Sequence, residues 1–196
     1  MDGCTSKATL GHIMSNCQTM LHQGRYTHRH DSCLNYIYKT LKENKPNHLE
    51  IFADLEDCKI NGGTVPPDVT LTGSRPDLVL VDRQSKKVSL IELTITWDTT
   101  ANTDSARDRK QARYAYLKED IEERGFHCFN NPLEIGTRGY ISQRNKSTIS
   151  YLAEICKVRK PKLFVKTIGK IALLGSYQIY LARNSQDWSS GGLLIP

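Results

Sequence analysis

Two stretches of apolar residues at helical spacing open the chain. They are Leu10, Ile13 and Met14, followed by Leu34, Ile37 and Leu41. Residues three and four apart lie on one face of a helix, so this spacing predicts two helical segments within residues 4–45. Gly24 separates the segments, and Lys45-Pro46 ends the second because proline cannot continue a helix.

The pattern then changes to short apolar runs that are typical of strands. Residues 57–76 contain Asn61-Gly62-Gly63 and Pro66-Pro67, which are turn signals and predict a connection. Leu78–Val81 and Val88–Ile95 lie on either side of a polar turn and predict a hairpin. The remaining expected elements are a helix capped by Thr103-Asp104 and closed by Gly125, short strands at 127–129 and 139–142, and helices at 147–156 and 162–183.

Length and composition fit one domain with a sizeable core. The chain has 196 residues, of which 38% are hydrophobic, and it lacks the run of about 18 apolar residues that a transmembrane helix needs. Its first residues do not show the basic and apolar regions of a signal peptide. Without an export signal, the six scattered cysteines are interpreted as reduced thiols or metal ligands rather than disulfides.

The net charge of +6 is distributed unevenly along the chain. Between Gly136 and Gln186 the only acidic residue is Glu154. The basic residues of this segment are Arg138, Arg144, Lys146, Lys157, Arg159, Lys160, Lys162, Lys166, Lys170 and Arg183. Alone, such a run is best interpreted as a solvated surface, but beside a candidate nuclease site it indicates a face that binds a polyanion.

Two carboxylates lie on the neighbouring strands of the expected hairpin. Asp77 begins the first strand, and Glu92 lies on a mostly apolar face of the second. The hairpin brings them together, and two close carboxylates repel each other unless a cation intervenes. Mg²⁺ or Mn²⁺ suits this place, because hard divalent ions prefer oxygen ligands and keep waters for phosphate contact. Glu134 either adds a third acid or pairs with Arg138 or another nearby cation.

A lysine follows on the next expected helix. Lys110 shares a stripe with Ala106, Tyr114, Leu117 and Ile121, which otherwise suit a core. A lysine at such a position either extends its charged end to the surface or works in a site. In a site it would orient the attacking water or stabilise charge on a phosphate. Because the two acids precede it, the sequence favours the second interpretation.

Together these residues resemble the restriction-enzyme-like endonuclease domain of site-specific non-LTR retrotransposons, the type that inserts into ribosomal RNA genes, within the PD-(D/E)xK nuclease superfamily. The matching segments are Arg75-Pro76-Asp77-Leu78, Ile91-Glu92-Leu93-Thr94 with Trp97-Asp98, Arg109-Lys110-Gln111-Ala112-Arg113-Tyr114, His127-Cys128-Phe129 and 134–139. Residues 10–17 and 24–31 resemble the linker upstream of such domains. The second of these is either a solvated turn or a nucleic-acid contact. The joint pattern is specific, whereas each short motif alone is weak.

The resemblance implies a fold, a cofactor and a role for each residue. The fold would be α/β, a mixed central sheet flanked by helices with an N-terminal helical appendage. Asp77 and Glu92 would bind Mg²⁺ or Mn²⁺. Lys110 would be the catalytic lysine, which this family carries on the helix rather than at the strand position of Thr94. Arg113 matches a second basic catalytic position that is often lysine. The expected activity is nicking of target DNA, whose free 3′ end then primes reverse transcription.

The chain departs from the family at a zinc knuckle of the form Cys-x2-Cys-x7-His-x4-Cys. Cys4, His12 and Cys17 match the last three positions, but the first cysteine is missing. Three ligands do not make a closed structural zinc site, and a fourth would have to come from His22 or Cys33. We therefore do not expect zinc to be stably bound, and helix packing is the alternative role of these residues.

The chain also has no reverse-transcriptase portion and resembles the C-terminal piece of an element. The expected partners are DNA and a reverse-transcriptase portion or element RNA supplied in trans, without a membrane. A DNA substrate implies a nuclear location. The expected divisions are a helical linker with a zinc-knuckle remnant at 1–46, the endonuclease domain at 47–186 and a tail at 187–196. Two alternatives stay open: a DNA-binding remnant that no longer cuts, and a decayed product without function.

Overall fold

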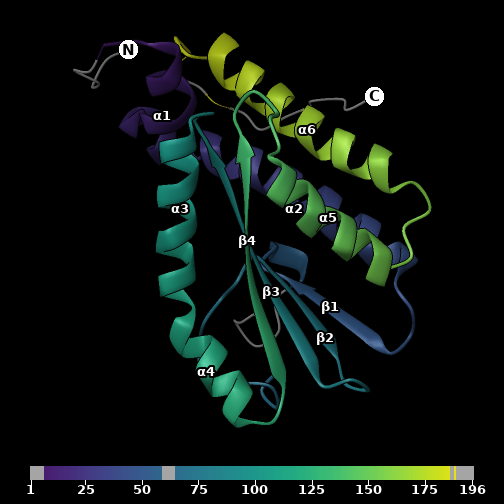
Figure 1. Cartoon of the computed structure of the whole chain (residues 1–196). Coiled ribbons are helices and arrows are strands. Elements are labelled where there is room, and N and C mark those ends of the chain that lie inside the picture. Colours follow the sequence, from purple (N-terminus) through teal and green to yellow (C-terminus); the bar gives the residue numbers. More distant parts are fainter. Residues whose placement is uncertain (1–6, 59–64, 186–187, 189–196) are drawn as a thin grey trace.

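A four-stranded sheet lies at the centre of the computed structural model, which describes residues 7–58, 65–185 and 188 (Figure 1). The strands are β1 (Leu49–Ala53), β2 (Leu78–Asp82), β3 (Lys87–Thr96) and β4 (His127–Gly136). The helices are α1 (Gln18–His22), α2 (Arg25–Asn44), α3 (Thr100–Arg113), α4 (Ala115–Glu123), α5 (Gln143–Ile155) and α6 (Pro161–Leu181). Two short helical turns, η1 (His12–Asn16) and η2 (Glu56–Cys58), complete the described elements.

The sheet is mixed, and its strands differ in length. Its order is β1-β2-β3-β4, with antiparallel pairing from β1 to β3 and parallel pairing between β3 and β4. Leu78 at the start of β2 pairs with Ile91, so β2 accompanies only the first half of β3. From Glu92 to Thr96, β3 pairs with β4 alone, and Figure 1 shows these two strands extending beyond β1 and β2. This leaves a free edge of β3 next to the beginning of β2.

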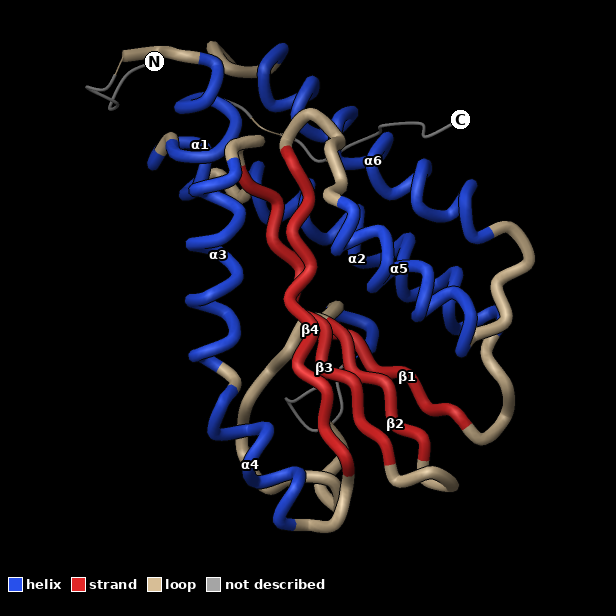
Figure 2. Tube along the Cα trace, viewed as in Figure 1, coloured by secondary structure: helices blue, strands red, loops and turns tan. Residues whose placement is uncertain are grey.

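Helices cover both faces of the sheet, because successive strand residues point to opposite sides. Figure 2 shows α3 and α4 on one side and α2, α5 and α6 on the other. On the α2, α5 and α6 side, the strands contribute Leu78, Leu80, Ile91, Leu93, Leu133 and Ile135 to one buried cluster. On the α4 side, they contribute Val79, Val81, Val88, Leu90 and Cys128 to another. The expected α/β class, with a mixed sheet flanked by helices, is confirmed.

Two buried arginines of α2 fix the N-terminal helices to the end of α6. Arg25 donates hydrogen bonds to the carbonyl oxygens of Ala182 and Ser185. Arg29 donates to the Met14 carbonyl at 2.8 Å and to the Ser176 hydroxyl at 2.9 Å. Burial lowers the pKa of Arg29 to about 10. Because α2 also packs on the sheet, residues 25–44 belong to the same core as the strands.

Several expected elements agree with the structure, and their local signals explain why. The hairpin is confirmed as β2 and β3. Gly24 separates α1 from α2 with a left-handed φ of 72°, and α2 ends at Asn44, just before Lys45-Pro46. The division at residue 46 stays a prediction, and the tail lies outside the described residues apart from Trp188. None of the described helices is long and apolar enough to cross a bilayer.

Other elements differ from the prediction. Strand β1 was not predicted. The helix predicted over 103–124 is two helices that meet at Tyr114, and the first of them is capped by Thr99 instead of Thr103-Asp104. The strand at 127–129 extends to Gly136, because it pairs with β3 along ten residues. No strand forms at 139–142, since Gly139 turns the chain (φ 80°) toward α5.

We predict that Gly169→Ala destabilises the fold. In a helix, alanine is normally favoured over glycine by about 1 kcal/mol, but here the new Cβ would lie 2.7 Å from the backbone oxygen of Gly139. Backbone cannot move aside as a side-chain end does, so overpacking should prevail and lower the free energy of unfolding by about 1–3 kcal/mol. Urea denaturation measures the change. Gly73→Ala, with no heavy atom within 4 Å of the new Cβ, is the control. A Gly169→Ala protein as stable as wild type would contradict the packing.

Candidate active site

Asp77 lies just before β2, beside the free edge of β3. Its Oδ2 accepts a hydrogen bond from the Leu93 amide at 2.7 Å, and its own amide donates to Glu92 Oε2 at 3.2 Å. Its carbonyl accepts from the Asp54 amide at 2.9 Å. The two carboxylates that the sequence placed on neighbouring strands are therefore next to each other, linked through the backbone.

Glu92 is a nearly buried acid surrounded by cations. Its side chain is 4% exposed and bonds to Lys110 of α3. Glu92 Oε1 accepts a short hydrogen bond from Lys110 Nζ and lies 3.9 Å from a guanidinium nitrogen of Arg113. A buried carboxylate is costly unless it is paired and hydrogen-bonded, and both oxygens of Glu92 meet that condition. The structure thus brings all four predicted site residues, Asp77, Glu92, Lys110 and Arg113, into one acid–lysine cluster.

Tyr114 fixes the end of α3 and so fixes where Lys110 and Arg113 lie. Its hydroxyl donates a hydrogen bond of 3.1 Å to the Arg75 carbonyl, two residues before Asp77. Burial, and then the charge of nearby Glu92, raise the pKa of Tyr114 above its usual range. The phenol therefore stays protonated and remains a donor. Lys110 shares this inward stripe, as the helical spacing predicted, and its side chain is 18% exposed.

Sequence reasoning missed His30 as a member of the cluster. From α2, His30 Nε2 lies 3.3 Å from Asp77 Oδ2, and Nδ1 lies 2.9 Å from Asp31 Oδ1. Burial alone would lower the pKa of His30, but the bonds to Asp31 and Asp77 outweigh it and raise the pKa to about 10. The imidazole is therefore a cation at neutral pH and fixes Asp77. No local pattern links residues 47 apart in the sequence.

Asp54 is a second residue that the sequence did not connect with the site. It follows β1, and its carboxylate forms an ion pair with Arg75. Because its amide also bonds to the Asp77 carbonyl, this turn supports the segment that holds Asp77. The mostly apolar segment Leu49–Ala53 directly before it was the available signal, since a strand there would have placed Asp54 at a strand end.

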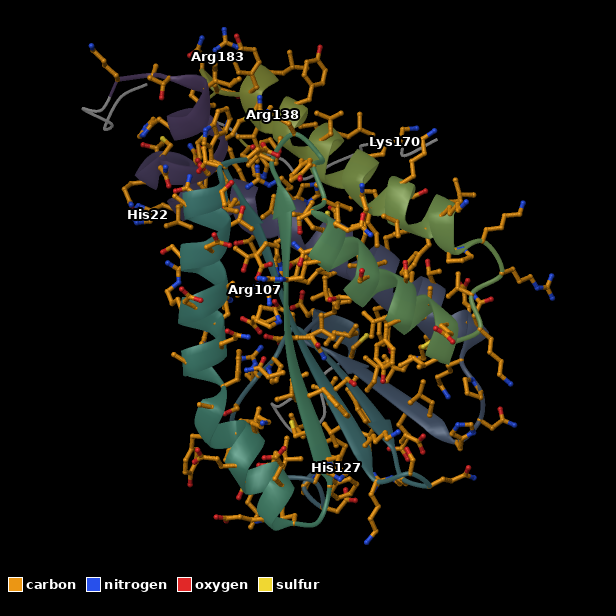
Figure 3. The ribbon with its side chains drawn as sticks, in the orientation of Figure 1. His22, Arg107, His127, Arg138, Lys170 and Arg183 are labelled. Atoms are coloured by element: carbon orange, nitrogen blue, oxygen red, sulfur yellow. The ribbon has the colours of Figure 1, made fainter. Side chains whose placement is uncertain are left out.

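Glu134 pairs with a cation of its own. Its Oε2 lies 3.2 Å from Arg107, and its carbonyl accepts from the Asn145 side chain at 2.6 Å. Figure 3 shows Arg107 between α3 and β4. Arg138 instead bonds to Asp98 Oδ2 at 3.1 Å. Of the two roles considered for Glu134, the ion pair is therefore the one found, with Arg107 as the partner in place of Arg138.

The two carboxylates of the cluster are the simplest set of ligands that fits a hard divalent ion. Mg²⁺ is commonly bound by one or two carboxylates, while waters and substrate phosphates complete its coordination. Asp77 and Glu92 supply such a pair, and Asp77 Oδ1 accepts no hydrogen bond from the described residues. No group of three or more His, Cys, Asp or Glu side chains in the described residues has the arrangement of a metal site. Waters and a substrate would thus have to provide the remaining ligands.

The zinc expectation is not tested, because Cys4 lies outside the described residues. Cys17 is 1% exposed and packs with Ile13, Met20 and Ile179. Cys33 is buried in the core around the sheet, and burial raises the pKa of its thiol to about 12. Since zinc binds the thiolate, Cys33 is a poor substitute ligand.

Comparison with known proteins assigns no family to this chain. No protein-family model matches it, and no curated protein is significantly similar to it in sequence. The chemistry of the site and the sequence resemblance are therefore what bear on the function. Paired carboxylates that can hold a divalent ion, beside a lysine, can support hydrolysis of a phosphodiester.

We predict that His30 stabilises the fold in a pH-dependent way. Its pKa is about 10 in the folded protein and roughly 6.5 when unfolded. A raised pKa gives stabilisation that is complete below about pH 6.5 and is lost as the pH rises toward 10. The stability difference between wild type and His30→Gln should therefore shrink across this range, on the order of a few kcal/mol.

Urea denaturation at several pH values between 6 and 10 measures this difference, in which titrations common to both proteins cancel. Substitution of the exposed His48 by Gln is the control. A difference that stays constant over this range would show that His30 is not held as a cation by the two acids.

Proposed function

We propose that this chain is a metal-dependent DNA endonuclease domain of the kind found in site-specific non-LTR retrotransposons. The observation that carries the proposal is the cluster itself: Asp77 and Glu92 are adjacent, and Lys110 from α3 bonds to Glu92. A mixed sheet with helices on both faces is also the architecture that the sequence resemblance implied. Thr94, at the strand position where many PD-(D/E)xK enzymes carry lysine, lies on β3, and Lys110 from α3 bonds to Glu92 instead.

Each residue of the cluster has a defined task in this proposal. Asp77 and Glu92 would hold Mg²⁺ or Mn²⁺, which when bound would polarise the phosphate and help to ionise a water. Lys110 stabilises negative charge on the phosphate or orients the water. Arg113 is 64% exposed, and its contact with Glu92 is a loose ion pair of 3.9 Å. Its guanidinium is therefore available to a phosphate. His30 keeps Asp77 in place.

The proposed reaction is hydrolysis of one DNA strand. A water adds to phosphorus, the bond between phosphorus and the 3′ oxygen breaks, and the leaving oxygen takes up a proton. The products are a 3′ hydroxyl and a 5′ phosphate. The free 3′ hydroxyl is the end that would prime reverse transcription, with the polymerase portion or element RNA supplied in trans. The nuclear location follows from the same DNA substrate.

A second candidate is a domain that binds DNA without cutting it. It is favoured by the exposed basic residues of the C-terminal half, since a cationic surface attracts nucleic acid whether or not the acids hold a metal. The two candidates differ in one property that is easily measured, the metal-dependent relaxation of supercoiled DNA.

We predict that the purified chain nicks supercoiled plasmid in Mg²⁺ or Mn²⁺ but not in EDTA. Asp77→Asn and Asp77→Ala remove a metal ligand, and Lys110→Ala removes the charge beside Glu92, so each should lower nicking by at least about a hundredfold. Asp108→Ala and Arg109→Ala alter exposed residues of the same helix α3 and should leave nicking unchanged.

Circular dichroism would verify that each variant is folded, and Asp77→Asn keeps the shape of the side chain if the alanine variant is unstable. Nicking that is equal in wild type and a folded Asp77→Asn protein would refute the assignment. A folded wild type that binds DNA but never cuts it in either metal would establish the second candidate instead.

A further inference from the structure

A basic hollow lies between α5 and α6. It has a volume of about 880 Å³, and its lining includes Lys146, Lys157, Lys162 and Lys166. These lysines are exposed, whereas Ala153, which also lines the hollow, is buried, and Val158 and Val165 are half-buried. Glu154 is the only acid in this lining, so the hollow combines a cationic rim with an apolar floor.

A second hollow of about 360 Å³ continues the first, since both are lined by Lys146, Val165 and Lys166. It adds Arg138, Tyr140 and Lys170, and no acid. We call the two hollows together the α5–α6 groove. None of its lysines has an ion pair with the residues that the structure describes, and Figure 3 shows Lys170 on the outer side of α6.

The α5–α6 groove is separate from the acid–lysine cluster. Its lining contains none of Asp77, Glu92, Lys110, Arg113 or His30. Helices α5 and α6 cover the face of the sheet on which α2 packs, whereas Lys110 comes from α3 on the other face (Figure 1). Binding in this groove can therefore be measured without cleavage.

Lys157 adds a backbone observation to this charge pattern. It follows α5 with a left-handed φ of 57°, a conformation that costs free energy for any side chain and that helix ends usually give to glycine. It lines the groove, as Lys162 does. A charged residue thus occupies a position where glycine would relieve strain.

We propose that the α5–α6 groove binds single-stranded DNA, with phosphates along the lysine rim and bases against the apolar floor and Tyr140. Tyr140 lines the groove, follows the end of β4 by four residues and is 64% exposed. Binding of single strands commonly combines a cationic groove with aromatic side chains on which the bases stack. The choice of DNA over RNA rests on the proposed endonuclease function.

The apolar floor distinguishes this occupant from two others. Duplex DNA presents phosphates on its outside and hides the faces of its bases, so it would leave the floor uncovered. An acidic peptide would satisfy the lysines, but exposed Tyr140, with Lys146 in the same lining, suits a stacked base beside a phosphate. Single-stranded DNA meets the rim and the floor together.

The test uses the full chain in EDTA with a labelled thymidine oligonucleotide of about 15 nucleotides, followed by fluorescence anisotropy at several salt concentrations. Lys157→Gly removes a charge and relieves strain, so binding should weaken several-fold while the unfolding midpoint does not fall. The slope of log affinity against log salt should decrease by about 0.7. Lys146→Gln/Lys166→Gln should weaken binding roughly tenfold or more, and Tyr140→Ala about fivefold or more.

Lys86→Gly is the matched control. Lys86 is exposed, has a left-handed φ of 51° and lies in the turn between β2 and β3, away from the groove. The same substitution there should change affinity less than twofold. Wild-type affinity in Lys157→Gly and in the double variant would overturn the proposal. So would tighter binding of a duplex, of RNA or of a polyglutamate peptide than of the single-stranded DNA.

The outcomes for the groove and for the nuclease are distinguishable. Nicking that depends on Asp77, together with groove variants that bind normally, would support the endonuclease proposal and refute the proposal that the groove binds single-stranded DNA. Groove-dependent binding by a chain that never nicks would do the reverse.

Discussion

The buried charge of Glu92 is the interaction on which the arrangement of the site depends. A carboxylate inside the protein loses several kcal/mol of hydration free energy and must be compensated by close partners. Glu92 finds them in Lys110, in Arg113 and in the Asp77 amide. Two of these belong to α3 and one to the start of β2. The charge of Glu92 therefore fixes α3 against the sheet and fixes Asp77 at the free edge of β3.

The same cations that stabilise the fold set the conditions for binding a metal. Glu92 is neutralised by Lys110, and Asp77 by the imidazolium of His30. Under the proposed function, a divalent ion at these carboxylates would compete with charges already present, so its affinity would be lower than for a bare pair of acids. A bound phosphate would shift the balance, because it would add oxygen ligands for the metal and accept the displaced cations. Metal and substrate would then favour each other in this cluster.

Local patterns in the sequence predicted the parts of the site that depend on local geometry. Strand alternation placed Glu92 on an inward face, and helical spacing placed Lys110 toward it. His30, Asp54 and Arg107 escaped detection because their contacts arise from docking: α2 onto the sheet, β1 onto β2, and α3 against β4. The sequence contains the residues, but the partner of each is decided by packing between distant segments.

The acid–lysine cluster and the α5–α6 groove differ in their balance of charge, and the two are proposed to act on a substrate and to hold it, respectively. In the cluster, Asp77, Glu92 and Asp31 face His30, Lys110 and Arg113, so the charges nearly cancel beyond the screening distance of about 10 Å. The α5–α6 groove has several lysines without an ion pair among the described residues, and its lining has a single acid. Under the two proposals, long-range attraction for a polyanion would therefore come from the groove rather than from the acids. Loss of the metal chemistry would leave the attraction of the groove for a polyanion intact. One fold is therefore compatible with a domain that cuts DNA and with a domain that only binds it. The state of the acid–lysine cluster decides between the two.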